Sequence, residues 1–183
     1  MTEVRLDQFD NSGYHPGPWW KRAVWYVVQS VFISSGIPWP YGLKRACLRL
    51  FGAAIGPGVV IKPRVRIKYP WKLKVGVHSW IGEDAWIDNL DEVTIGAHCC
   101  ISQGAYLLCG NHDYSTPTFD LIIRPIVMKD GSWAGAHSIL GPGATLGTEA
   151  VLTAGSVGLG SLSPRHIHQG NPAEPVRKRE IRP

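Results

Sequence analysis

Aliphatic residues return at an interval of six along most of the chain. From Ile55 onward this spacing is broken only by short offsets and one longer interruption. The repeating positions are Ile55, Ile61, Ile67 and Leu73, then Ile81 and Ile87, then Ile95, Ile101 and Leu107, and finally Ala134, Leu140, Leu146 and Leu152. Small or β-branched residues often lie four positions later, among them Val59, Val65, Ala85, Ala105, Ala144, Ala150 and Ser156. This interval matches neither the helical period nor the alternation of a half-buried strand.

The interval of six predicts an all-β fold, a parallel β-helix whose flat faces are short strands. Three hexads make one triangular turn of about 18 residues, and the aliphatic side chains stack inward on those of the adjacent coil. Glycines that follow aliphatic positions ease the corners, because glycine tolerates backbone angles that other residues avoid. We expect an N-terminal extended or helical segment at 1–52, the coil at 53–160 with a protruding loop at 109–125, and a C-terminal tail at 161–183.

The N-terminal segment contains one apolar stretch, residues 23–37 (AVWYVVQSVFISSGI), which predicts a helix. The stretch is shorter than the ~20 residues that cross a bilayer. It lies between Lys21-Arg22 and Lys44-Arg45. Two interpretations remain open. The helix lies peripherally on the inner membrane surface, anchored by its tryptophans, or it packs against the rest of the fold or a neighbouring subunit.

Composition and charge narrow the classes of partner. The formal net charge is +5, and basic residues gather at 62–74 and at 177–182. Such clusters favour phosphate-bearing partners, either a nucleotide cofactor or lipid headgroups. No nucleic-acid module accompanies them, so nucleic acid is not expected as a partner. The four cysteines show no metal-binding spacing and the N-terminus does not resemble an export signal, so we expect reduced thiols in a cytoplasmic protein.

Three stretches of the chain resemble one family. LRLFGAAIGPGVVIKPRVRIKYPWKLKVG (48–76), VTIGAHCCISQGAYLLCGNHDYS (93–115) and HQGNPAEPVRKR (168–179) resemble the hexapeptide-repeat acyltransferases, in particular the colanic-acid-type exopolysaccharide O-acetyltransferases. The resemblance implies a left-handed coil and a homotrimer with active sites between adjacent subunits. It also implies acetyl-CoA as the donor, a sugar hydroxyl of an exopolysaccharide or its precursor as the acceptor, and no required metal.

The repeat is interrupted between residues 109 and 125 (CGNHDYSTPTFDLIIRP), and His112 lies at the start of this interruption. Loops on a rigid scaffold often carry function. A sugar hydroxyl is a weak nucleophile and imidazole titrates near neutral pH, so His112 is the predicted general base, as the resemblance also implies. The alternative is a loop histidine bonded to a nearby backbone carbonyl. Asp113 follows where the maltose and galactoside enzymes have proline, which directs the prediction away from simple free sugars.

The remaining candidates divide into an acceptor set and a donor set. The resemblance implies an acceptor-binding asparagine near Asn89, and the alternative is an asparagine that satisfies the backbone of a turn. The other acceptor candidates are Asp88, Asp91, Asn111 and Tyr114. The resemblance also implies a donor groove beside the last coils, which Trp133, Gly135, Ala136, Ala154 and Gly155 match, with Arg177 and Lys178 placed to meet CoA phosphates.

Two other function classes compete with the transferase. A zinc hydratase of the γ-carbonic-anhydrase type needs three histidines that converge on one metal. His78, His98, His112 and His137 are widely spaced and form no HxxxxH pair. A non-catalytic β-helix that serves as a binding or assembly module is the second rival. It predicts no affinity for acetyl-CoA and tolerance of His112→Ala.

Overall fold

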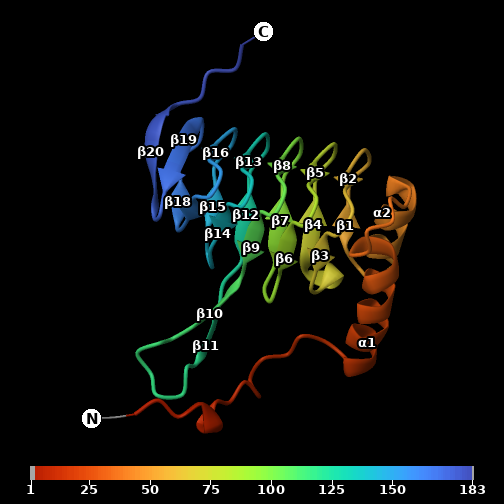
Figure 1. Ribbon diagram of the computed structural model, residues 1–183, viewed down its shortest axis with the longest axis vertical. Helices are drawn as coiled ribbons and strands as arrows, with labels where there is room; N and C mark the ends of the chain where they lie inside the picture. The colour runs from red at the N-terminus through yellow and green to blue at the C-terminus, as the bar shows by residue number, and fades with distance from the viewer. Residues whose placement is uncertain (1–2, 183) are drawn as a thin grey trace.

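A parallel β-helix forms most of the molecule, as the computed structural model of the chain shows for residues 3–182 (Figure 1). The chain winds through three sheets of short strands, and most strands pair in parallel with the strand one coil later. The first sheet contains β1 (Ala54–Ile55), β4 (Leu73–Val75), β7 (Val93–Ile95), β12 (Ile126–Met128), β15 (Thr145–Leu146) and β18 (Ser161–Leu162). The third contains β3 (Arg66–Ile67), β6 (Trp86–Asp88), β9 (Tyr106–Leu108), β14 (Ile139–Leu140) and β17 (Val157–Gly158).

The second sheet continues into the C-terminal residues. It contains β2 (Val60–Ile61), β5 (Trp80–Ile81), β8 (Cys100–Ile101), β13 (Trp133–Ala134), β16 (Val151–Leu152), β19 (His166–Gly170) and β20 (Ala173–Lys178). β18 and β19 pair in parallel with the preceding coil, and β20 turns back antiparallel on β19. The coil therefore extends beyond the predicted boundary at residue 160.

The hexad positions form the core. Every repeating aliphatic residue from Ile55 to Leu152 is buried, and so are the small residues that follow them, from Val59 to Ser156. Each inward side chain lies on its counterpart in the next coil, as Ile61 lies beside Ile81 and Ile81 beside Ile101. The prediction of a coiled β core from the six-residue interval is confirmed.

The first coils are longer than the predicted 18 residues. Ile55 pairs with Val75 and Val75 with Ile95, so one coil there spans 20 residues. The short 3-10 helix η3 (Pro70–Lys72) occupies the third corner of the first coil. The later coil from Val127 to Thr145 has the expected 18-residue length.

One corner of the coil repeats a left-handed backbone. Residues with positive φ follow one another there, coil after coil: Gly58, His78, His98, Gly131, Glu149 and Arg165. The rings of His78 and His98 stack with centroids 5.4 Å apart. These coil histidines are thus turn residues, and their conformation costs about 1–2 kcal/mol each relative to glycine.

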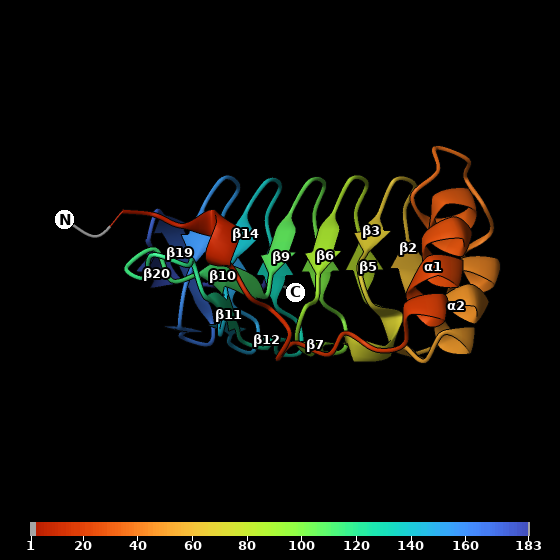
Figure 2. The same cartoon turned by 90° about the horizontal axis from the view of Figure 1, so that it is seen from below.

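A helical cap, residues 19–50, covers the N-terminal end of the coil (Figures 1 and 2). It contains α1 (Trp19–Val28), the π-helical turn η2 (Gln29–Ile33) and α2 (Tyr41–Leu50), after a short 3-10 turn η1 (Leu6–Gln8) in the preceding arm. The prediction of a helix over 23–37 is confirmed for residues 23–33, and its predicted end is wrong. The helical run ends at Ile33 and is followed by a Gly- and Pro-containing linker, because proline cannot continue a helix.

The helical cap supplies hydrogen-bond donors to backbone carbonyls at the open edge of the first coil, where no strand of an earlier coil can pair with them. Arg45 Nη1 donates to the carbonyl of Val59 at 2.8 Å, and Trp25 Nε1 donates to the carbonyl of Ile67 at 2.8 Å. Further donors come from Lys44, which bonds the Lys62 carbonyl, and from Arg49, which bonds the Ile55 carbonyl. Burial lowers the pKa of the Lys44 ammonium, which has no exposed surface. Three cationic side chains and one indole therefore donate the hydrogen bonds that strands of an earlier coil would otherwise supply.

All four cysteines are free thiols. Cys99 and Cys109 are buried, and burial raises the pKa of Cys109 to about 12. Thiolates are the reactive form of cysteine, so these two side chains act as apolar core residues.

Within residues 3–182, every helix is too short or too polar to cross a membrane.

Candidate functional site

A β-hairpin leaves the coil between the third and first sheets and carries His112 (Figure 1). Its strands are β10 (Gly110–His112) and β11 (Leu121–Ile123), which pair antiparallel with His112 opposite Leu121. The prediction of a protruding segment at this interruption is confirmed. His112 is the last residue of its strand, and its side chain is exposed.

A backbone carbonyl orients the His112 ring. His112 Nδ1 lies 2.7 Å from the carbonyl oxygen of Phe119, across the hairpin. A carbonyl only accepts, so Nδ1 carries the hydrogen and Nε2 keeps its lone pair. Phe119 adopts a left-handed φ of 52°, and the Phe9 ring contacts the imidazole edge to face with centroids 5.5 Å apart. The backbone bond of the alternative interpretation is present, and it leaves Nε2 able to take a proton.

A cavity of about 510 Å³ lies beside His112. Its lining comes mainly from the N-terminal arm and the corner of the first coils, namely Phe9, Asn11, Ser12, Tyr14, Pro16, Arg22, Lys68, Tyr69, Leu90 and Leu121. The arm is held by Arg5 N–H, which donates to Pro117 at 2.8 Å, and by Tyr14 Oη, which donates to the carbonyl of Leu90 at 2.8 Å. Burial raises the pKa of Tyr14, so its hydroxyl stays a donor. Sequence reasoning missed this arm because no periodicity marks it.

The predicted role of Asn89 is corrected by the structure. Its side chain has no exposed surface. Asn89 Oδ1 accepts from the Tyr69 N–H at 2.9 Å, and Nδ2 donates to the Tyr69 carbonyl. The amide is therefore fully used by the corner of the neighbouring coil, and Asn89 has the turn-satisfying role.

The other acceptor candidates also stand outside the lining of the His112 cavity. Asp88 is 7% exposed, pairs with Lys68 Nζ at 2.9 Å and accepts a bond from Tyr106. Asp91 accepts from the N–H of Glu92, and Asn111 accepts from the N–H of His112. Tyr114 is 84% exposed in the hairpin loop.

Three of the six basic residues in the cluster at 62–74 pair with acids one coil away. Arg64 pairs with Asp84 and Glu83, Lys68 with Asp88, and Lys74 with Glu92. Arg66 lies over the Trp86 ring at 4.3 Å from its centroid. These side chains are thus engaged in contacts between coils, which argues against a phosphate-binding site at 62–74.

A second cavity, of about 500 Å³, lies where the second sheet turns into the third; we call it the donor groove. Five predicted donor residues line it: Trp133, Gly135, Ala136, Ala154 and Arg177. Gly155 and Lys178 do not, whereas Arg179, which was not predicted, does. Strand alternation explains why Arg179 lines the groove and Lys178 does not, because residues 177 and 179 share a face of the strand that residue 178 does not share.

The floor of the donor groove is made of closely spaced backbone. A Cβ on Gly135 would lie 2.7 Å from the backbone nitrogen of Ala154, so only glycine fits there. Trp133 Nε1 donates to Ser102 Oγ at 2.8 Å, which fixes the indole as one wall. Among residues 3–182 the N–H groups of Ala136 and Ala154 have no acceptor, so two backbone donors are available to an extended amide-bearing chain.

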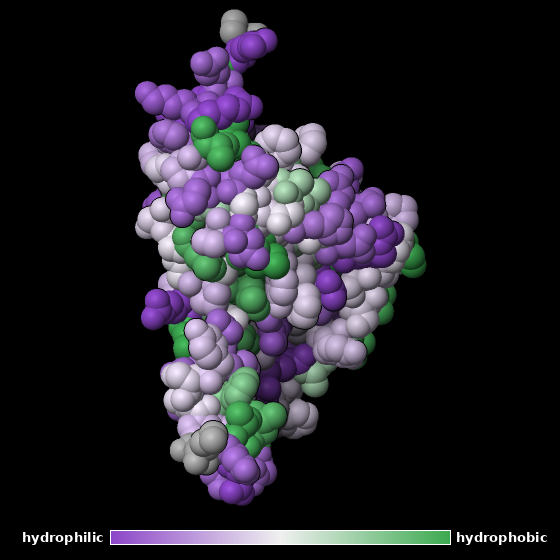
Figure 3. Space-filling model, turned by 60° about the vertical axis from the view of Figure 1, so that its left-hand side comes forward, coloured by the Kyte–Doolittle hydropathy of each residue, from purple (hydrophilic) through white to green (hydrophobic). Residues whose placement is uncertain are grey.

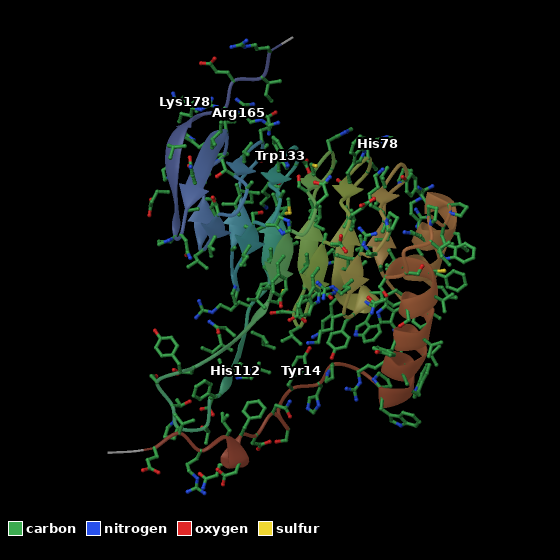
Figure 4. The ribbon with its side chains drawn as sticks, viewed as in Figure 1. Tyr14, His78, His112, Trp133, Arg165 and Lys178 are labelled. Carbon is green, nitrogen blue, oxygen red and sulfur yellow. The ribbon has the colours of Figure 1, made fainter. Side chains whose placement is uncertain are left out.

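Within one chain, His112 and the donor groove occupy different corners of the coil. The hairpin follows the third sheet, while the groove lies between the second and third sheets. Figure 4 shows His112 and Trp133 on opposite sides of the ribbon. The two cavities share no lining residue.

The coil histidines do not converge. His78 and His98 stack at one corner and His137 lies at another, while His112 is on the hairpin. Residues 3–182 contain no group of three or more His, Cys, Asp or Glu side chains placed to hold a metal ion.

Comparisons with known proteins give the family. No protein-family model matches the chain. The chain is 39% identical over 167 residues to the putative colanic acid biosynthesis acetyltransferase WcaF of Escherichia coli K12, covering 91% of this chain and 92% of that protein. It is 24% identical over 138 residues to the galactoside O-acetyltransferase of Escherichia coli K12, covering 74% and 68% respectively. A Vibrio cholerae hexapeptide-repeat acetyltransferase, solved with acetyl coenzyme A, has a TM-score of 0.79 at 20% identity and covers 88% of each chain.

The chain belongs to the hexapeptide-repeat acetyltransferase family, whose coil is left-handed. The prediction of an acetyl-CoA-dependent acetyltransferase is confirmed at the level of this family.

Proposed function

We propose that the protein transfers an acetyl group from acetyl-CoA to a sugar hydroxyl of an exopolysaccharide or its precursor. The observation that carries the proposal is the fixed ring of His112, whose Nδ1–H is held by the Phe119 carbonyl beside a cavity of about 510 Å³. The glycan class follows from the name of the relative WcaF, a putative colanic acid biosynthesis acetyltransferase.

In this proposal His112 Nε2 accepts the proton of the acceptor hydroxyl as its oxygen attacks the thioester carbonyl. The new C–O bond forms, the C–S bond breaks, and the imidazolium returns its proton to the departing CoA sulfur. The Phe119 carbonyl stabilises the imidazolium, because it remains bonded to Nδ1–H while Nε2 carries the transferred proton.

The donor groove fits a pantetheine arm. Small and apolar residues make up much of its lining, and the N–H groups of Ala136 and Ala154 suit the carbonyls of an extended amide chain. Arg177 is exposed at the groove and suits a phosphate. Arg179 donates to the carbonyls of Gly131 and Glu149, so its role in the groove is structural.

The separation of His112 from the donor groove supports a homotrimer with shared sites. A histidine at one corner of the coil cannot serve a groove at another corner of the same chain. In a ring of identical subunits the two corners meet across each heterologous interface. Each active site would then take His112 from one subunit and the groove from the next.

Calorimetric titration with acetyl-CoA tests the donor half without knowledge of the acceptor. We expect about one CoA per subunit, and a rise of about tenfold in Kd for Arg177→Ala, the loss of one charge-assisted phosphate contact. Lys178→Ala is the matched control, because Lys178 is adjacent and exposed but outside the groove. Undetectable binding by the folded protein would remove acetyl-CoA as donor and favour a binding module.

Mixed oligomers test the shared site. His112→Ala and Arg177→Ala chains are co-expressed, purified as mixed oligomers and assayed at acetyl-CoA concentrations well below Kd, where each variant is impaired alone. Random mixing should restore about a quarter of the wild-type rate per site, the share of interfaces that hold both intact residues. If the mixture is only as active as the average of the two variants, both residues act within one chain.

A further inference from the structure

The helical cap leaves an unusually apolar face in solvent. Along α1 and the following turn η2, Trp20, Val24, Val27 and Val31 recur at helical spacing and are 57%, 49%, 62% and 44% exposed. On α2, Leu43 is 38% exposed and Leu50 is 83% exposed. Figure 1 shows the two helices together at the end of the coil. By contrast, the coil surface in Figure 3 mixes hydrophilic atoms with small apolar groups.

The opposite face of α1 already packs on the coil. Trp25 and Ile33 are buried there, and Trp25 is bonded to the first coil. A surface helix needs one apolar stripe to pack on its own domain, and this helix has two. The outer stripe is therefore surplus to the fold of the single chain and fits an apolar partner.

The helical cap itself carries an excess of positive charge. Residues 19–50 contain five lysines and arginines, namely Lys21, Arg22, Lys44, Arg45 and Arg49, and no Asp or Glu. The cations of the cap bond to neutral partners, as Arg45 does with the Val59 carbonyl. Lys21 lies over the Trp71 ring at 4.6 Å. Two such faces would repel each other across an interface, so the charge disfavours a second copy as the occupant.

We propose that the helical cap docks on an anionic lipid surface. Apolar side chains of α1 and α2 would enter the boundary between headgroups and acyl chains, while the surrounding cations attract acidic headgroups. Trp19 and Tyr26, 73% and 70% exposed, have the amphipathic rings that favour this boundary. Helices of this length lie on the surface and do not span it.

The cavity of the proposed acceptor lies along the other side of α1. Arg22 lines the His112 cavity, and it also lines a neighbouring cavity together with Trp25 and Tyr26. Docking through the outer stripe would therefore hold the acceptor cavity within about one helix diameter, ~10 Å, of the membrane surface, where a glycan attached to a lipid carrier is presented. This consequence rests on the proposed function, whereas the docking itself does not.

Vesicle co-sedimentation of the intact protein tests the docking without any catalytic step. The protein should sediment with phosphatidylglycerol-containing vesicles at low salt and much less with pure phosphatidylcholine. Salt should weaken binding, because surface charges are screened. The double variant Trp20→Ser/Val27→Ser should bind at least about tenfold more weakly, since two apolar side chains are lost from the boundary.

The matched control is Trp80→Ser/Leu159→Ser, which removes two side chains of similar exposure, 57% and 53%, from outside the cap. Circular dichroism checks that both variants are folded, and light scattering gives their oligomeric state. Equal vesicle binding by the two variants, or no sedimentation of the intact protein, would overturn the proposal. A smaller oligomer for the cap variant alone would overturn it too, by making this face a subunit interface. Acetyl-CoA binding is measured in parallel, so failure of docking is distinguishable from failure of the transferase proposal.

Discussion

Replacing His112 by alanine should abolish most transfer while leaving the fold almost unchanged. The ring is exposed. It makes one hydrogen bond, to the Phe119 carbonyl, an edge contact with Phe9 and a looser tilted contact with the Phe119 ring. Loss of these contacts costs at most about 2 kcal/mol of unfolding free energy, a fall in Tm of no more than ~8 °C for a chain of this size. Loss of a general base should lower kcat by about 10² to 10⁴.

The assay follows release of the CoA thiol with a panel of glycan acceptors, and thermal unfolding is measured on the same preparations. The Kd for acetyl-CoA should change little, because the proposed binding contacts with the pantetheine arm and the phosphates come from the donor groove and Arg177, and not from His112. His78→Ala is the control, since His78 is a corner residue stacked on His98. A His112→Ala variant that keeps more than about a tenth of the activity would refute the general-base argument.

Three further substitutions test the hairpin, the corners and the helical cap. Phe119→Val should lower kcat about tenfold or more, because a β-branched residue resists the left-handed φ of 52° at this position. Phe119→Gly should keep activity, because glycine adopts this φ readily. Equal rates for the two variants would contradict the role of the carbonyl of residue 119 in orienting His112. Gly76→Ala should lower the unfolding free energy by about 1–3 kcal/mol in denaturant titration, since its Cβ would lie 2.5 Å from the next coil's backbone. Gly36→Ala, with nothing within 4 Å, is its control and should be near neutral. Trp25→Phe should cost about 1–3 kcal/mol by leaving the Ile67 carbonyl without its donor, and an unchanged midpoint would show that water replaces the indole.

The six-residue repeat was enough to predict the parallel coil without the structure. Each inward residue, such as Ile61 or Ile101, contacts its counterpart at a nearly constant distance along the chain, so the packing is local and periodic. A periodic contact leaves a periodic pattern, which is why the core and the hairpin interruption before His112 could be predicted. The resemblance to the family supplied the candidates for the donor groove, and five of them line one cavity because its floor lies on consecutive coils.

Tertiary structure decided what the pattern does not encode. The arm that places Tyr14 beside His112 folds back from the other end of the chain, and no short-range signal marks that contact. Asn89 and Lys68 looked available in sequence, but the neighbouring coil uses the first for the Tyr69 backbone and pairs the second with Asp88. Burial and pairing across coils depend on which residues lie one turn away, and the two extra residues per coil at the start shift that register. Whether a polar side chain is used in packing or stays available for function therefore depends on the residues that the neighbouring coil places beside it.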